Sequence, residues 1–319
     1  MPEAAGLLRV VDDHLLAWVL LSVAVGALVP SLRRLTVFTL PILAVMVGSV
    51  SLTLSPAAFR AVDRRALALV LVVQTGMPVL AYGLARALSL SPDLVLGFVV
   101  LGAVTPELVT PTMTELGRGD TALSTTVLVL VGAGSLLLVP GAASLLVGSA
   151  VSAGRIVETL LLAVVGPMAL AVAARARYPD HVGRYDDVYP SVSALMVVLV
   201  IGIVTAANVG IVRANADRLT PVLAGAVALN GGGYLAGWVS TRAFERATRV
   251  AATLSVGMRD FAVAAALVVA AGFPAVAALP AVVFGVVEMT TSAGLARFFA
   301  AAAPAERGLD PADSPSSGP

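Results

Sequence analysis

The stretch Ala251-Ala-Thr-Leu-Ser-Val-Gly-Met-Arg-Asp-Phe-Ala-Val-Ala264 has the apolar character of a membrane-spanning helix, yet it carries Arg259 and Asp260 at its centre. An ionisable side chain in the middle of a bilayer costs at least ~2.5–3.5 kcal/mol, so it is retained mainly where it faces a protein interior or a water-filled cavity. Gly257 lies two residues before Arg259 and favours a break in the helix. The sequence therefore predicts an interrupted, charged helix in the middle of a membrane.

A counterpart of this stretch lies about 150 residues earlier. The apolar run Leu101–Thr114 contains Pro106 and Pro111, with Glu107 between them. A proline lacks a backbone N–H group and disfavours helix in the residue before it, so backbone groups around 105–110 are freed from the helical ladder. Two interrupted, charged spans in corresponding halves of a chain are typical of transporters whose binding site lies near the bilayer midplane.

The composition agrees with a membrane protein. Of the 319 residues, 59% are hydrophobic and only 12% are charged, whereas soluble domains average about 25% charged residues. The apolar runs are roughly 17–25 residues long, which indicates a helix bundle and excludes an outer-membrane barrel. Cysteine is absent, and His14 and His181 fall at the edges of the runs, which excludes disulfides, thiolate metal sites and haem ligation. The basic residues are all arginines and are dispersed, so nucleic acid is not an expected partner.

We expect a single transmembrane domain over residues 1–300 and a disordered cytoplasmic tail over 301–319. The first run could be a signal-peptide core, but the weakly basic segment before it favours a retained span. Asp93 and Asp120 are expected to mark helix starts. The segment Arg175–Asp187 is expected to be a connector. Ten spans are predicted, of which the fourth and ninth are broken: Leu15–Val29, Val37–Leu54, Ala66–Leu88, Pro92–Leu116, Thr121–Ser149, Ile156–Ala174, Val188–Val212, Pro221–Ser240, Ala247–Gly272 and Pro274–Phe299.

Splitting the ten spans five and five gives two repeats of opposite orientation, about 14–149 and 153–300, because an odd number of spans inverts the second copy. Both termini then lie on one side of the membrane. The arginines concentrate on that side, for example in the segments Arg60–Arg65 and Arg242–Arg249. Because positively charged loops remain in the cytoplasm, we expect both termini there.

Four charged residues fall near the centres of their spans: Glu107, Arg259, Asp260 and Glu288. We expect Glu107 and Arg259 to form an ion pair, because they occupy similar positions in the two repeats. Such a pair could bind ligands, or it could only fix the packing of two helices. Three acids against one arginine leave a negative excess, so either one carboxyl is protonated or a cation binds.

Hydroxyl groups accompany these charges. Thr110 and Thr112 follow Glu107, and Ser124 opens the next span. These side chains could contribute to a binding site. Proline kinks with threonine hydrogen bonds to the backbone are also common in membrane helices that bind nothing.

Four short motifs follow one another along the chain: Met46-Val-Gly-Ser-Val-Ser-Leu-Thr-Leu-Ser55, Gly119-Asp-Thr-Ala-Leu-Ser124, Gly257-Met258 and Leu279-Pro-Ala-Val-Val-Phe-Gly285. In this order they resemble the bile acid/sodium symporter superfamily, over most of the chain from Met46 to about Phe298, and the chain is identified as a divergent bacterial member. The resemblance implies ten helices, with a panel of spans one, two, six and seven and a core of the others. It also implies that the fourth and ninth spans cross at the binding sites, and that the cargo is an organic anion driven by sodium.

The chain departs from the family where the resemblance implies sodium ligands. Ser255 stands in place of a shared carboxylate, and Arg259 stands in place of an amide. Ser124 and Gln74 still match ligand positions. We therefore expect that the family's two sodium sites are not both intact, and that a sodium ion, if one binds, uses Ser124, Glu107 and Asp260. An arsenite exporter is disfavoured because cysteine is absent.

We expect a secondary active transporter that moves a small organic anion across the bacterial inner membrane by alternating access. Arg259 and the half-helix N-termini would attract the anion, and Glu107, Asp260 or Glu288 would handle a proton or sodium ion, with transport more sensitive to pH than to sodium. The alternative is an uncoupled channel or a sensor on the same bundle. No ATP-binding loop or nucleophile–base set is visible, so an enzyme is not expected. Beyond the bilayer, the anion and the cation, the sequence predicts no partner, cofactor or oligomeric state.

Overall fold

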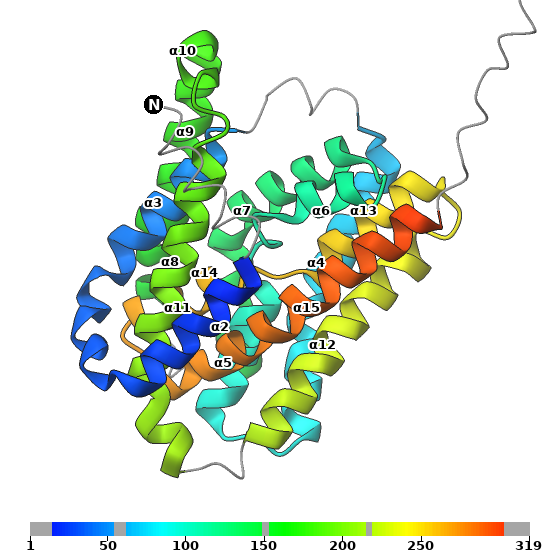
Figure 1. Cartoon of the computed structure of the whole chain (residues 1–319). Coiled ribbons are helices and arrows are strands. Elements are labelled where there is room, and N and C mark those ends of the chain that lie inside the picture. The colour runs from blue at the N-terminus through cyan, green and yellow to red at the C-terminus, as the bar shows by residue number, and fades with distance from the viewer. Residues whose placement is uncertain (1–14, 54–61, 149–152, 215–218, 303–319) are drawn as a thin grey trace, which may run out of the picture.

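The computed structural model describes residues 15–53, 62–148, 153–214 and 219–302 (Figure 1). Within these ranges the chain forms helices joined by turns and contains no strand, which confirms the predicted all-α class. The predicted tail lies outside the described residues from residue 303 onward. The first half contains α2 (Leu15–Leu28), η1 (Pro30–Phe38), α3 (Thr39–Ser51), α4 (Arg64–Ala87), α5 (Pro92–Ala103), α6 (Thr110–Leu116), α7 (Thr121–Ala142) and the π-helical η3 (Ala143–Val147).

The second half is built from similar elements. They are α8 (Ala153–Leu160), the π-helical η4 (Leu161–Val165), α9 (Gly166–Arg177), α10 (Pro179–Gly183), α11 (Tyr189–Ala214), α12 (Leu219–Ser240), α13 (Arg246–Gly257), α14 (Phe261–Ala270), η6 (Ala275–Ala278) and α15 (Leu279–Ala301).

The helices have the length and composition needed to cross a membrane. Two shorter apolar helices, Ala17–Leu28 and Pro92–Ala103, fall on the predicted first and fourth runs. Eight longer helical stretches fall on the other predicted runs: Pro30–Ser51, Arg64–Ala87, Thr121–Val147, Ala153–Arg177, Tyr189–Ala207, Leu219–Ser240, Arg246–Ala270 and Ala275–Ala301.

Acidic residues mark several helix starts, and Asp93 and Asp120 were expected to do so. Asp120 caps α7 by accepting a hydrogen bond from the backbone N–H of Leu123 at 2.9 Å. Asp63 caps α4 through the N–H of Arg65 at 2.7 Å. Asp93 lies in the first turn of α5, where its charge meets the positive end of the helix dipole.

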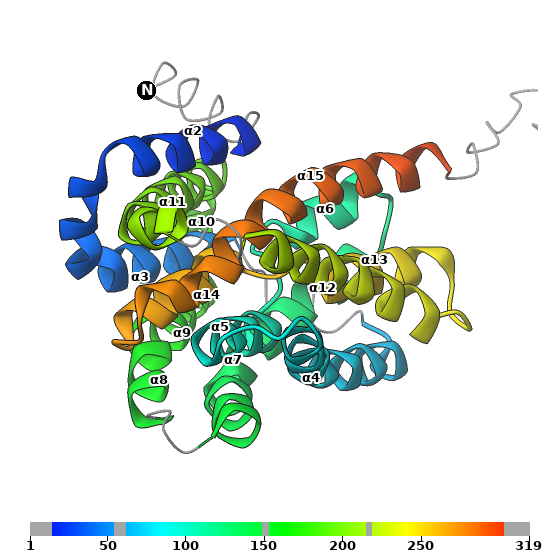
Figure 2. The same cartoon turned by 90° about the horizontal axis from the view of Figure 1, so that it is seen from below.

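The helices pack in two groups. One group contains α2, α3, α9 and α11, and the other contains α4, α5, α7, α12, α13 and α15, as the view in Figure 2 shows. Helix α14 contacts both groups, because it packs against α3 and α11 as well as α5 and α15. The break between α13 and α14 therefore lies where the two groups meet.

Helices α12 and α13 approach each other closely because α12 presents glycines to its neighbour. A Cβ atom on Gly237 would lie 2.4 Å from the carbonyl oxygen of Ala252, and one on Gly233 would lie 2.8 Å from that of Val256. Both obstacles are backbone atoms of α13, so a larger residue at either position would push the helices apart. This packing fixes the half-helix that leads into the break.

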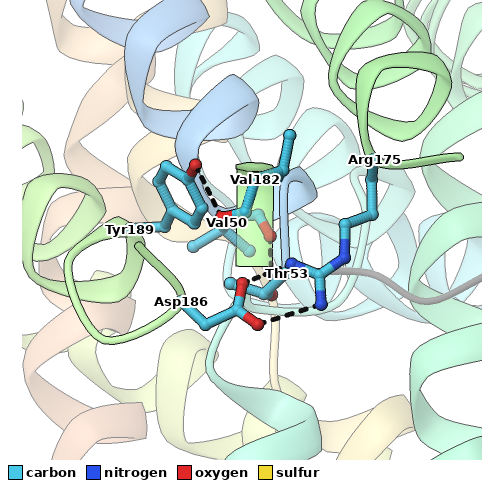
Figure 3. Close-up of polar contacts among 6 residues, drawn as sticks. All are labelled: Val50, Thr53, Arg175, Val182, Asp186 and Tyr189. Carbon is cyan, nitrogen blue, oxygen red and sulfur yellow. Dashed lines mark hydrogen bonds and ion pairs between the residues drawn. The ribbon is translucent and has the colours of Figure 1, made fainter. Parts of the chain in front are cut away.

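The predicted connector Arg175–Asp187 contains helix α10 and is held in place by polar contacts (Figure 3). Arg175 forms a two-pronged ion pair with Asp186, in which Nη2 lies 2.9 Å from Oδ2. The Tyr189 hydroxyl donates to the carbonyl oxygen of Val182 at 3.1 Å. These contacts join the connector to the last turn of α9 and to the first residue of α11.

Candidate functional site

The first break separates α5 from α6. Helix α5 ends at Ala103, and Val104 adopts an extended conformation with φ −68° and ψ 168°. Helix α6 begins at Thr110, whose backbone N–H and hydroxyl both donate to the carbonyl oxygen of Glu107, at 2.9 and 2.6 Å. Thr110 thus orders the break internally, since its hydroxyl is committed to the backbone.

The second break separates α13 from α14. Helix α13 ends at Gly257, and Met258 is extended with φ −83° and ψ 135°. A Cβ atom on Gly257 would lie 2.0 Å from the ring of Tyr234, so a glycine is needed at this helix end. Asp260 caps α14 by accepting a hydrogen bond from the N–H of Val263 at 2.7 Å.

The two breaks touch, as predicted. The backbone N–H of Asp260 donates to the carbonyl oxygen of Thr105 at 3.0 Å. Nη1 of Arg259 donates to the carbonyl oxygen of Val104 at 3.2 Å. Each break therefore satisfies part of the backbone that the other leaves without a helical partner.

Arg259 is the largest side chain that is completely buried among the described residues. Its single hydrogen bond goes to Val104, and Nε and Nη2 have no partner in the described part of the chain. The predicted ion pair with Glu107 is wrong for this conformation, because within the described ranges Arg175–Asp186 is the pair that comes within 4.0 Å. The guanidinium turns to the free carbonyl oxygen at the end of α5 instead.

Three acids form a buried group beside the crossing. Glu107, Asp260 and Glu288 all have side chains that are almost or completely inaccessible to solvent. Glu107 interacts electrostatically with both other carboxyls, and Glu288 also interacts with Asp260. Within the described residues, no three His, Cys, Asp or Glu side chains are arranged to hold a metal ion. We call Glu107, Asp260 and Glu288 the carboxyl cluster.

The members of the carboxyl cluster differ in their hydrogen bonds. The carboxylate of Glu107 faces the backbone N–H groups of Leu108 and Phe261, and Asp260 accepts from Val263. Neither carboxyl oxygen of Glu288 has a partner among the described residues. The N-terminus of α14 is thus occupied by the protein's own carboxylates, and the prediction that it attracts an external anion does not fit this arrangement.

A second polar cluster joins α4, α6, α7 and α13. The hydroxyl of Ser124 accepts from those of Thr114 at 3.2 Å and Ser255 at 3.3 Å. Nε2 of Gln74 donates to the carbonyl oxygen of Ser255 at 2.7 Å, whereas its buried Oε1 has no partner among the described residues. Gln74, Ser124 and Ser255 were predicted site residues, and the structure brings them together with Thr114 as an oxygen-rich group, which we call the hydroxyl cluster.

Thr112 does not belong to either cluster. It is exposed on the outer side of α6, whereas Thr110 and Thr114 are buried. Residues four apart share a face of a helix, and a residue midway between them lies on the opposite side. This periodicity was readable in the sequence, and Thr114 was the better candidate.

Asn230 is a residue that the sequence analysis missed. Its Nδ2 donates to the carbonyl oxygen of Gly257 at 3.1 Å, and its Oδ1 accepts from the hydroxyl of Thr291 at 2.7 Å. Asn230 thereby ties the second break to α15, one turn from Glu288. A lone amide in the middle of an apolar run was the signal that could have identified it.

A small cavity adjoins the first break on the side of the other helix group. Its volume is about 10 Å³, close to the minimum that holds one water molecule. Thr105 thus lies at a nearly closed seam between the two groups. The seam is lined by Val47 and Ser51 of α3, Thr105 and Leu108 of the break, Leu128 and Gly132 of α7, Val164 of η4 and Met168 of α9.

Comparison with known proteins agrees with this architecture. The model of the Sodium Bile acid symporter family matches residues 40–215, more than half of the chain, including the first break. A Bacillus subtilis (strain 168) protein described as "Uncharacterized sodium-dependent transporter YocS" is 27% identical over 299 residues, which cover 88% of this chain and 89% of that protein. The resemblance in the sequence motifs is thereby confirmed, and the chain belongs to the Sodium Bile acid symporter family of multi-pass membrane transport proteins.

Proposed function

We propose that the protein is a secondary active transporter that carries a small organic anion across the inner membrane by alternating access, coupled to a proton or sodium ion. The observation that carries this proposal is the crossing of two interrupted helices at Arg259, a buried cation with free N–H groups, beside three buried carboxyls. Membership of the family supports transport, and the name of the Bacillus relative supports sodium as the coupling ion.

Arg259 is the anion-binding group in this proposal. A buried guanidinium with unsatisfied donors is strongly destabilising, because an uncompensated buried charge costs several kcal/mol. A carboxylate or sulfonate could accept from Nε and Nη2 together, in the geometry that favours two parallel hydrogen bonds. The neighbouring seam at Thr105 would have to widen to admit such an anion, as expected when the two helix groups move relative to each other.

The cation has two candidate positions. Glu288 is the carboxyl we assign to a proton, because N–H donors stabilise the charged forms of Glu107 and Asp260 while Glu288 has none. The hydroxyl cluster, with the free Oε1 of Gln74, offers neutral oxygen ligands for one sodium ion. A sodium site at Ser124, Glu107 and Asp260 fits less well, because Ser124 bonds to Thr114 and Ser255 rather than to the carboxyl cluster.

We further propose that the chain has ten spans in two inverted repeats. The two short apolar helices and the eight long ones would be these spans, with α5–α6 and α13–α14 as equivalent interrupted elements. Both termini lie in the cytoplasm in this proposal, because arginines concentrate on their side.

The experiment that tests the proposal has two stages. First, small carboxylates and sulfonates are screened for thermal stabilisation of the purified protein, with and without sodium, against Arg259→Gln as a control. The stabilising anion is then used in counterflow assays in proteoliposomes. A carrier shows uptake stimulated by the same anion on the opposite side, whereas uptake without such stimulation would identify a channel and contradict the proposal.

A further inference from the structure

An apolar groove lies on the outer surface of the bundle, and one of its lining residues, Tyr234, also packs against Gly257 at the second break. It is formed where α12, α13 and the C-terminal end of α15 come together (Figure 1). Its volume is about 550 Å³. Leu235 and Phe298, which line it, are 63% and 64% exposed. An exposed apolar groove of this size in helices that cross a bilayer faces lipid chains rather than water.

Aromatic residues form the floor of the groove. Trp238 of α12 stacks on Phe299 of α15, with ring centroids 5.4 Å apart. The guanidinium of Arg249 lies over the ring of Trp238, 3.7 Å from its centroid. Tryptophan and arginine side chains in this combination are typical of the level where acyl chains give way to headgroups.

One end of the groove lies beside helix ends that are rich in arginine, and Arg246 lines the groove itself. The helix ends 241–249 and 295–302 contain four arginines and one acid, Glu245. Arg246 lines the groove and donates through Nη2 to the carbonyl oxygen of Phe299, one of the last free carbonyls of α15. Nε of Arg249 is buried without a partner among the described residues. The four arginines are Arg242, Arg246, Arg249 and Arg297.

We infer that this groove binds an anionic phospholipid, with an acyl chain along Leu235 and Phe298 and its phosphate at Arg242, Arg246 and Arg249. The largely apolar lining and the volume of about 550 Å³ suit a hydrocarbon chain. The cluster of arginines at one end complements a negative headgroup, as in other basic pockets between membrane helices. Because Arg246 and Arg249 belong to α13, the lipid would brace the half-helix that leads into the second break. The site is separate from Arg259 and does not depend on the proposed transport function.

The two tryptophans of the chain, Trp18 and Trp238, allow a direct test. In a Trp18→Phe protein, Trp238 reports on the groove. The protein is placed in phosphatidylcholine nanodiscs that contain a small fraction of phospholipid with brominated acyl chains, which quench tryptophan fluorescence on contact. We expect brominated phosphatidylglycerol to quench Trp238 at a roughly fivefold lower mole fraction than brominated phosphatidylcholine, the ratio expected for one headgroup charge interacting with an arginine near the membrane surface.

Matched variants identify the contacts. Arg242→Gln with Arg246→Gln should abolish the preference for phosphatidylglycerol, whereas Arg64→Gln with Arg65→Gln, at the start of α4, should retain it. In the complementary Trp238→Phe protein, Trp18 is the reporter and should be quenched equally by both lipids. Equal quenching of Trp18 shows that the two lipids mix evenly around the protein. This control does not need the arginine variant, so it remains valid if that variant does not fold.

Three results would overturn the inference. The first is equal quenching of Trp238 by the two lipids. The second is a preference that survives removal of Arg242 and Arg246. The third is a marked rise in quenching when the chain is truncated after Ala302, because the following segment of the protein would then be the natural occupant of the groove.

Discussion

Arg259 combines complete burial with an incomplete set of hydrogen bonds, and on this combination we base the proposal that it binds the transported anion. Replacing a buried charged group with an apolar side chain of similar size is often stabilising. Sites that bind ligands commonly reduce stability in this way.

We therefore predict opposite effects of Arg259→Met on stability and transport. The purified protein without anion should become more stable by on the order of 1 kcal/mol or more, because the uncompensated charge is removed. Anion transport should be abolished. Thermal unfolding and counterflow measure the two effects, and Arg86→Met, at an exposed arginine, should change neither by much. A variant that is less stable than wild type would show that Arg259 has a structural role.

Glu288 is the carboxyl that we expect to titrate during transport. Glu288→Gln keeps the shape of the side chain and removes the group that would bind and release the proton, so the dependence of uptake on pH should flatten. Thr290→Ala, a neighbouring exposed position on α15, is the matched control. Uptake measured across a pH series decides the point. An unchanged pH profile in Glu288→Gln would assign the proton to another group.

Asn230 holds the second break through the carbonyl oxygen of Gly257. Asn230→Leu should lower the free energy of unfolding by about 1–3 kcal/mol, because a buried carbonyl oxygen is left without a donor. Denaturant titration of the purified protein measures this loss. A stability equal to that of the wild type would mean that this hydrogen bond contributes little.

At the scale of the helices, the interruptions were predictable because they have local causes. Pro106 follows the end of α5, and Pro111 lies in the first turn of α6, where the missing N–H group is tolerated. Gly257 is the last residue of α13. The N-terminal cap at Asp260 was also readable, since a carboxylate directly before a helix is a favoured cap. The partners of the charged side chains were not predictable. Whether Arg259 meets Glu107 or the carbonyl oxygen of Val104 depends on how two distant helices cross, and residue spacing does not determine that.

The contact between α12 and α13 gives a prediction at the same scale. Gly237→Ala should destabilise the protein by about 1–3 kcal/mol, because the added methyl group meets the backbone of α13. Gly231→Ala in the same helix has open space around its Cβ position and should be tolerated. Thermal unfolding of the two variants compares them directly. Equal stabilities would show that the helices pack less closely than the structure indicates.

At the scale of the whole molecule, the proposed orientation with both termini in the cytoplasm rests on the arginine distribution and can be tested because the chain lacks cysteine. Cysteines introduced at Ser31 and Ser89 should react with an impermeant thiol reagent in intact cells, and one at Ser314 should not. The reverse pattern would place the termini outside.

The central claim is that the guanidinium of Arg259 supplies a positive charge at the crossing of the two breaks. In the two-sodium scheme that the family resemblance implies, a bound sodium ion would supply that charge. The most direct test is initial uptake of the transported anion into proteoliposomes as a function of sodium concentration at constant pH. With at most one sodium site, activation by sodium should be hyperbolic or absent. A steep, saturable, sigmoidal activation would require at least two cooperating sodium ions and would contradict the claim.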